Sequence, residues 1–134
     1  MDHLEIIADG MSRGRGVLRR AIDGLDHAAL QYRPAEHTNP IGWLAWHIAR
    51  IEDMHVADLL EEGQLWTDGG WHERFGMPSD ARDFGTRQTL DEPRFQPLSN
   101  VGVRINSLIH HAAHHGGQID YLRGLRDPSA DGLA

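Results

Sequence analysis

Apolar residues recur at the spacing of an amphipathic helix in three stretches of the chain. The first stretch covers about residues 3–25. The second starts at Pro40, which suits the first helical position behind an Asn39 cap, and Gly63 is suited to end it. The third runs from about residue 101 to residue 125. Because no stretch alternates apolar and polar residues as a strand does, the pattern predicts an all-α fold built on three long helices.

The first predicted helix contains three glycines, at positions 10, 14 and 16. Each glycine inside a helix costs about 1 kcal/mol relative to alanine. We therefore expect this helix to depend on packing against another helix for its stability.

The two intervening stretches have no sustained period. Residues 26–38 are predicted to be a connector, because Pro34 ends any helical run there. Residues 63–100 are broken repeatedly by glycine and proline, and a short helix near residues 86–92 is the most that they are expected to hold.

Composition limits the classes of function. A chain of 134 residues suits one domain, and its net charge of −7 disfavours a nucleic-acid partner, because such a protein needs a basic face for phosphates. No apolar run reaches the roughly 18 residues of a membrane span. The first ten residues lack the basic start of a secretory signal, so we expect a cytoplasmic protein with no membrane partner. Cysteine is absent, which leaves nitrogen and oxygen as metal ligands.

Histidine is abundant, at 10 of 134 residues, and four histidines cluster in the third predicted helix. On a helical wheel, His111 and His115 lie toward the apolar stripe, whereas His110 and His114 point away from it. Residues four apart are neighbours on a helix, so His111 and His115 can direct two imidazoles at one metal ion. The alternative is a pair of structural histidines that bind no metal.

A complete metal site needs a third ligand from another core-facing position. The second predicted helix offers His47 and His55, and its periodicity does not choose between them. Gln118 lies about one turn beyond His115 and is placed to hold a ligand imidazole or a bound water. Three imidazoles with open positions suit Zn²⁺, Ni²⁺, Fe²⁺ or Mn²⁺.

Several segments resemble a known family. The second predicted helix and its approach read LQYRPAEHTNPIGWLAWHIARIED at 30–53, and the last helix contains HHAAHHGGQIDYLRGL at 110–125. With GGWHERFGMPSDARDFG at 69–85, they resemble the DinB superfamily of metal-binding four-helix bundles. This superfamily includes the metal-binding domain of mycothiol-dependent maleylpyruvate isomerase and thiol S-transferases that use bacillithiol or mycothiol.

The resemblance implies a set of metal ligands. In the family, one histidine comes from a W-H-[IL] segment on helix two, and two come from an H-x-x-x-H-x-G-Q pattern on the last helix. Carried over to this sequence, these residues are His47, His111 and His115. The resemblance thus selects His47 and leaves His55 unassigned.

The resemblance also implies an activity. It suggests a metal-dependent thiol S-transferase or related detoxification enzyme, in which the three-histidine site activates a low-molecular-weight thiol against a small-molecule electrophile. All 13 basic residues are arginine, which indicates a GC-rich coding bias and makes mycothiol the expected thiol. The alternative is a non-catalytic metal-binding or stress-response protein of the same superfamily.

The chain departs from the family pattern at the third bundle helix. Only residues 78–93 are available for it, so we expect a single domain over residues 1–134 with a shortened or missing third helix. The resemblance implies that the first histidine helix and the last helix run parallel, which needs a long return, and residues 63–100 are long enough to provide it. The face normally covered by the third helix would expose apolar surface, which predicts a homodimer.

Overall fold

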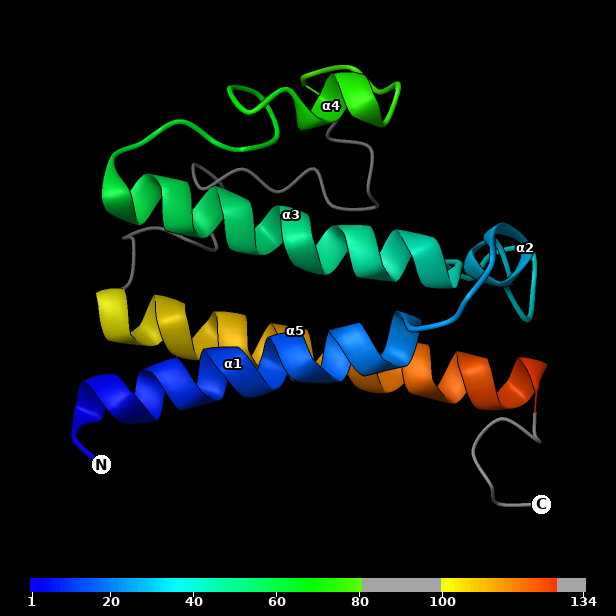
Figure 1. Ribbon diagram of the computed structural model, residues 1–134, viewed down its shortest axis with the longest axis horizontal. Coiled ribbons are helices and arrows are strands. Elements are labelled where there is room, and N and C mark those ends of the chain that lie inside the picture. Colours follow the sequence, from blue (N-terminus) through cyan, green and yellow to red (C-terminus); the bar gives the residue numbers. More distant parts are fainter. Residues whose placement is uncertain (81–99, 128–134) are drawn as a thin grey trace. The chain divides into compact units, whose positions relative to one another are not determined.

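The computed structural model describes residues 1–80 and 100–127, and every regular element in these two ranges is a helix (Figure 1). The prediction of an all-α bundle is therefore confirmed. The elements in chain order are α1 (His3–Ile22), α2 (His27–Leu30), α3 (Ile41–Leu60), α4 (Trp71–Arg74) and α5 (Val101–Arg126). None of the described helices is both long enough and apolar enough to cross a membrane.

The fold comprises two compact units. The first unit is made of Met1–Ile48 and Asn106–Ala134, and the second is Ala49–Ile105. The first unit holds α1, α2, the beginning of α3 and most of α5. The single-domain organisation expected from the sequence stays a prediction.

Helix α1 begins where the sequence pattern places it. The Asp2 side chain accepts a hydrogen bond from the Glu5 backbone N–H, and the Glu5 carboxylate accepts one from the Asp2 N–H. This reciprocal capping box satisfies two backbone donors that the first helical turn leaves without an intrahelical partner.

Helix α1 ends at Ile22, earlier than the predicted residue 25. The backbone leaves the helix at the extended Asp23 and at Gly24, whose φ is 72°, and the Arg123 guanidinium of α5 donates to three carbonyl oxygens at this end. These oxygens belong to Arg20, Ala21 and Asp23, at 3.2, 3.3 and 2.9 Å. A cation at a helix C-terminus satisfies free carbonyls and complements the helix dipole.

Glycines on α1 allow this helix to lie close to α5. A Cβ atom at Gly10 would lie 2.8 Å from Cδ1 of Ile109, and one at Gly14 would lie 3.1 Å from Cβ of Ala112. Two of the three glycines that lower the helix propensity of α1 thus let the two backbones approach, as the sequence-based expectation of stabilising packing requires, whereas Gly16 does not face α5.

The same interface continues on α5. A Cβ atom at Gly116 would lie 2.6 Å from Cγ1 of Val17. The residue numbers of the contacting positions increase in the same direction along both helices, from Gly10 with Ile109 to Val17 with Gly116. Helices α1 and α5 therefore run parallel (Figure 1).

The core of the first unit lies between α1, the beginning of α3 and α5. Ile41 and Ile119 are its largest fully buried side chains. Burial of each such side chain stabilises the fold by about 1.5–3 kcal/mol. The remaining buried members of this cluster are Ala21, Leu44, Ile48, Ala112 and Leu122.

Helix α3 begins one residue later than predicted, at Ile41. Pro40 precedes it, and the Pro40 carbonyl accepts the first helical hydrogen bond, from the Leu44 N–H at 3.2 Å. The predicted stop at Gly63 is wrong. Glu61 adopts a left-handed backbone with φ of 55°, and the Glu62 N–H closes on the Ala57 carbonyl at 2.9 Å. This is a Schellman ending with glutamate at the position that glycine usually fills.

The predicted connector 26–38 contains the short helix α2. Its N-cap is Asp26, whose side chain accepts a hydrogen bond from the Ala29 N–H at 2.7 Å. The sequence reasoning used Pro34 as a helix breaker but did not consider Asp26 as a cap. The short helix expected near residues 86–92 lies outside the described residues, as does most of the segment 78–93 that prompted the prediction of a shortened or missing third helix.

In the second unit, the end of α3 lies beside the start of α5. Arg104 forms an ion pair with Asp58 at 2.8 Å. Helices α3 and α5 run in opposite directions (Figure 1). The expectation that the two histidine-bearing helices are parallel is therefore wrong, and most of the long return expected at residues 63–100 lies outside the described residues.

Asp53 anchors the segment that follows α3 in the second unit. Its carboxylate accepts hydrogen bonds from the backbone N–H groups of Leu65 and Trp66, at 2.8 and 3.0 Å. Arg50 donates to the same carboxylate at 2.9 Å, and its guanidinium lies over the Trp66 ring. Asp53 therefore has a structural role.

The glycine interface predicts opposite effects for two adjacent substitutions on α5. Gly116→Ala meets Val17, whose branched side chain is stiff in a helix, so overpacking of about 1–3 kcal/mol outweighs the roughly 1 kcal/mol gained in helix propensity. Gly117→Ala has open space around the added Cβ and gains the propensity alone. Urea unfolding should show destabilisation by about 1 kcal/mol for the first variant and stabilisation by a similar amount for the second. Equal stabilisation by both would contradict the close approach.

Candidate metal centre

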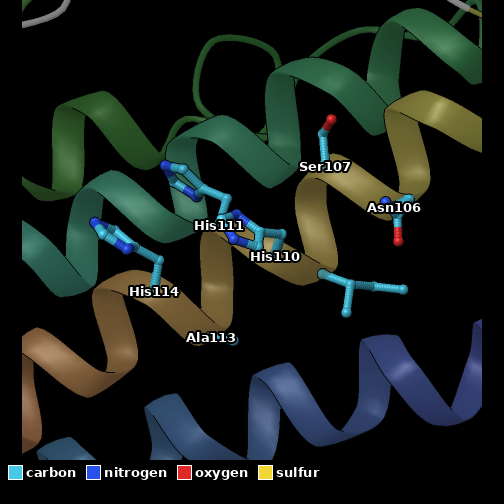
Figure 2. Close-up of a pocket in the computed structure, with 7 residues that line it drawn as sticks. Asn106, Ser107, His110, His111, Ala113 and His114 are labelled. Carbon is cyan, nitrogen blue, oxygen red and sulfur yellow. The ribbon is translucent and has the colours of Figure 1, made fainter.

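Helix α5 separates its four histidines between two faces. His110 and His114 are exposed, whereas His111 and His115 are partly buried. The orientation predicted from the helical wheel is confirmed. The exposed pair lines a hollow of about 690 Å³ on the side of α5, and His111 also reaches its wall (Figure 2).

His47 comes from the first part of α3 and is only 5% exposed. Its neighbours on the helix, Leu44 and Ile48, belong to the core cluster, so His47 lies on the core-facing side of α3. Trp43 lies one turn earlier and stacks on the imidazole, with ring centroids 4.7 Å apart and planes at 14°. The sequence analysis did not use this pair, although residues four apart on a helix are neighbours.

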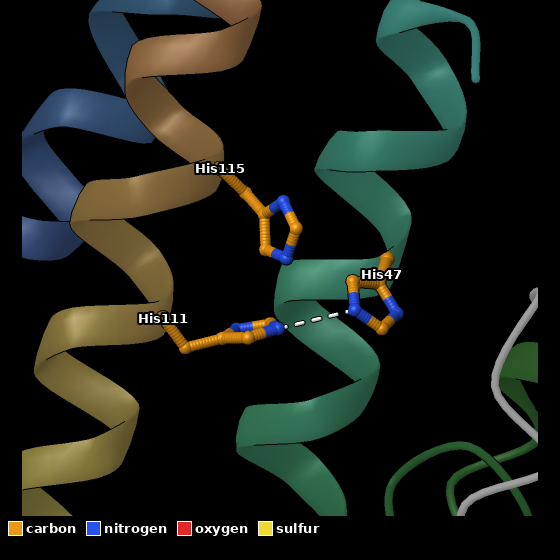
Figure 3. Close-up of side chains that lie close together, drawn as sticks. All are labelled: His47, His111 and His115. Carbon is orange, nitrogen blue, oxygen red and sulfur yellow. Dashed lines mark hydrogen bonds between the residues drawn. The ribbon is translucent and has the colours of Figure 1, made fainter. Parts of the chain in front are cut away.

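The structure brings His47, His111 and His115 together. Each residue offers one ring nitrogen, and these three nitrogens lie within 4.8 Å of one another. Figure 3 shows His111 and His115 extending from α5 toward His47 on α3. The Nε2 atoms of His47 and His111 lie 3.1 Å apart, at hydrogen-bond distance.

The spacing of these nitrogens fits a shared ion. Imidazole nitrogens bound at 2.0–2.1 Å lie about 2.9–3.4 Å apart at octahedral or tetrahedral angles. The 3.1 Å between Nε2 of His47 and Nε2 of His111 falls in this range. The wider separations, up to 4.8 Å, require the rings to draw inward by roughly 1 Å. Three imidazoles are a donor set that divalent transition-metal ions accept, so the cluster can bind a metal ion.

Gln118 lies where the sequence places it, beside His115. Nδ1 of His115 and Oε1 of Gln118 are 2.6 Å apart. Since a carbonyl oxygen only accepts, the His115 Nδ1 carries the proton in this pair and Nε2 keeps its lone pair. This tautomer leaves Nε2 as the nitrogen that can bind an ion.

Burial sets the protonation of His47. Desolvation, with a smaller contribution from the neighbouring His115, lowers the pKa of His47 to about 4. The ring is therefore neutral at pH 7, the form in which imidazole binds a metal ion, and no proton has to leave it on binding.

His55, the alternative third ligand, is outside the cluster. Its Nδ1 lies 3.3 Å from the Arg104 guanidinium, which also donates to the His55 carbonyl. Burial and the Arg104 charge lower the pKa of His55. The buried Arg104 thus occupies the side of the His55 ring where Nδ1 would otherwise be open to a metal ion.

Comparisons with known proteins identify the fold. A sequence model described as the DinB superfamily matches residues 11–92, which include His47 and stop before the histidines of α5. No curated protein matches the chain. The crystal structure of a conserved protein from Enterococcus faecalis is similar, with a TM-score of 0.72 and 19% identity over 93% of this chain and 97% of that chain. At this identity, the structural likeness concerns the fold alone.

The pKa of His47 predicts a pH-dependent loss of stability in the metal-free protein. The unfolded chain protonates this histidine near its ordinary pKa of 6.5, whereas the folded protein resists protonation until about pH 4. As the pH falls through this window, the unfolded state binds the extra proton, and on the order of 3 kcal/mol of stability is lost.

Urea unfolding in the presence of a chelator, at steps between pH 7.5 and pH 4, measures this loss. The control is His47→Gln, which has no titrating ring and should lose correspondingly less. The same pH slope in both proteins would show that His47 is not the group responsible.

Proposed function

Because the chain belongs to the DinB superfamily, we propose that His47, His111 and His115 bind one divalent metal ion and that the bound ion serves a thiol S-transferase reaction. The observation that carries the proposal is the convergence of three imidazole nitrogens, from two helices, within 4.8 Å. The resemblance of these residues to the metal-binding pattern of the superfamily supports the same assignment.

The donor set limits the metal. Three imidazoles and no thiolate favour ions that accept nitrogen ligands and leave further positions for water or substrate. Zn²⁺, Ni²⁺, Fe²⁺ and Mn²⁺ meet this requirement, with Zn²⁺ and Ni²⁺ bound more tightly than Fe²⁺ or Mn²⁺ by the same nitrogen ligands.

The reaction that we propose joins a low-molecular-weight thiol, mycothiol by preference, to a small-molecule electrophile. When bound, the ion would lower the pKa of the thiol and supply a thiolate at neutral pH. The thiolate sulfur forms a bond to the electrophilic carbon, and the leaving group departs with the electrons of the broken bond. The thiol proton passes to water.

The residues of the chain support this chemistry in separate ways. His47 is neutral and covered by Trp43, so water is kept from one side of the cluster. Gln118 orients His115 through Nδ1. His111 belongs to the cluster and also borders the hollow on α5, so one of the three proposed ligands is next to a space that a small molecule can enter.

The remaining expectations are parts of the same proposal. A thiol cosubstrate suits the reducing cytoplasm, which is the location expected from the sequence. The homodimer stays a prediction, since most of the segment that prompted it lies outside the described residues.

Removing one ligand should remove the metal. Protein prepared without a metal-affinity column, supplied with Zn²⁺ and dialysed extensively, should retain one ion per chain by elemental analysis. His115→Ala should retain none, and Gln118→Ala should bind about 10–100-fold more weakly, because the imidazole loses its orienting partner. His37→Ala, which alters an exposed histidine elsewhere, is the matched control and should retain the ion. Full retention by His115→Ala would refute the ligand assignment.

Thiol transfer can be measured directly with monochlorobimane, which becomes fluorescent when a thiol displaces its chloride. The metal-loaded protein should accelerate this reaction with mycothiol or another low-molecular-weight thiol, and His115→Ala should return it to the uncatalysed rate. If the protein retains its ion but accelerates no thiol in the panel, the transferase proposal fails and the non-catalytic metal-binding alternative is favoured.

A further inference from the structure

The outer face of α5 carries a second pair of histidines that the inner cluster does not use. His110 and His114 lie one turn apart, and both are exposed. Their ring centroids are 6.2 Å apart, and their planes differ by only 17°. The two rings therefore stand side by side and leave the helix in the same direction.

Such a pair has the donor chemistry of a metal site. Two imidazoles four residues apart on a helix can close on one ion, because exposed side chains rotate freely enough to bring a nitrogen from each within reach. Asn106, one turn before His110, is exposed on the same stripe and offers an amide oxygen. All three residues line the hollow on α5 (Figure 2).

The outer pair is continuous with the inner cluster. The ring centroids of His114 and His115 lie 5.0 Å apart, and those of His115 and His111 lie 4.5 Å apart. His111 also lines the hollow that His110 and His114 border. An ion held by the outer pair is thus separated from the inner ligands by only about the width of one imidazole ring. It can pass to the inner cluster by exchanging one nitrogen ligand at a time.

We propose that His110 and His114 form a second, exposed site for a divalent transition-metal ion, which captures the ion from solution and passes it to the cluster of His47, His111 and His115. The delivery step rests on the metal-binding function proposed above, whereas the capture site itself does not. The outer site binds more weakly than the inner one, because it has fewer ligands and they are solvated.

Ni²⁺ is a suitable probe, because imidazole binds it well. Isothermal titration of the metal-free protein should give two equivalents per chain, one tight and one weak. The double variant His110→Ala, His114→Ala should keep the tight equivalent and lose the weak one, while the control His37→Ala keeps both. Both substitutions are at exposed helical positions where alanine is favourable, and circular dichroism should show unchanged helix content.

Loading kinetics test the delivery step. Protein mixed with one equivalent of Ni²⁺ is quenched with chelator at successive times and desalted, and the retained Ni²⁺ is measured. A captured ion beside the inner ligands has a high effective concentration, so the double variant should load more slowly than wild type by about threefold or more. His37→Ala should load at the wild-type rate.

The outcomes separate this proposal from the proposed function. A single tight equivalent in wild type, a weak equivalent that survives in the double variant, or an unchanged loading rate would each overturn the capture site, while inner metal binding stands. Titration of His47→Ala and of His115→Ala tests the outer site when the inner cluster is disabled. A remaining weak equivalent that disappears when His110 and His114 are also replaced supports the outer site, even if the inner cluster fails to bind.

Discussion

A buried imidazole needs a partner for its ring nitrogens, and this requirement ties α3 to α5 at His47. The side chain lies among core residues, where an unsatisfied polar group costs about 1–3 kcal/mol. Its Nε2 meets the Nε2 of His111 at 3.1 Å, and its face is covered by Trp43. The ring nitrogens of His115 join this contact from one turn further along α5, so three imidazoles from two helices share one place in the core.

The short stretch of α5 around this cluster has three faces with different surroundings: α1, His47 and solvent. Ile109, Ala112 and Gly116 face α1. A Cβ atom added at a glycine of this interface, on either helix, would come too close to the opposite helix. The partly buried His111 and His115 turn to His47, and the exposed pair turns to solvent. The helix period of 3.6 residues makes this division possible, because residues only one or two apart face different neighbours. Four histidines within six positions therefore serve two different environments.

The sequence predicted the long helices and the facing of the α5 histidines, because both follow from hydrophobic periodicity. It left His47 and His55 as equal choices, since periodicity reports burial and not the partner that a buried ring finds. The contacts of Arg104 with His55 and Asp58 show that the end of α3 is engaged elsewhere. The direction of α3 relative to α5 was predicted wrongly for a related reason, because it was carried over from the family and the sequence pattern of a helix does not reveal its tertiary neighbour.

Local endings were also hard to predict. Helix α1 ends where an arginine about a hundred positions later in the chain reaches its carbonyls, a contact with no local signature. Helix α3 ends at Leu60 because the Schellman hydrogen bonds hold the following Glu61 in a left-handed conformation, although Gly63 looked more suitable. The Arg123 contact is tertiary and the Schellman bonds join backbone atoms, so residue preference alone reveals neither of them.

The contact between Arg123 and the end of α1 has a consequence for biosynthesis. It joins Arg20 to a residue 103 positions away, and the histidine cluster joins positions 64 apart. Helices α1 and α3 leave the ribosome long before α5, so their apolar faces lack α5 as a partner while the intervening residues are translated. Contacts between distant positions also slow folding, because a long loop must close before they form. The first unit therefore becomes a folded body only after α5 has been made, and the histidine cluster cannot be assembled before then.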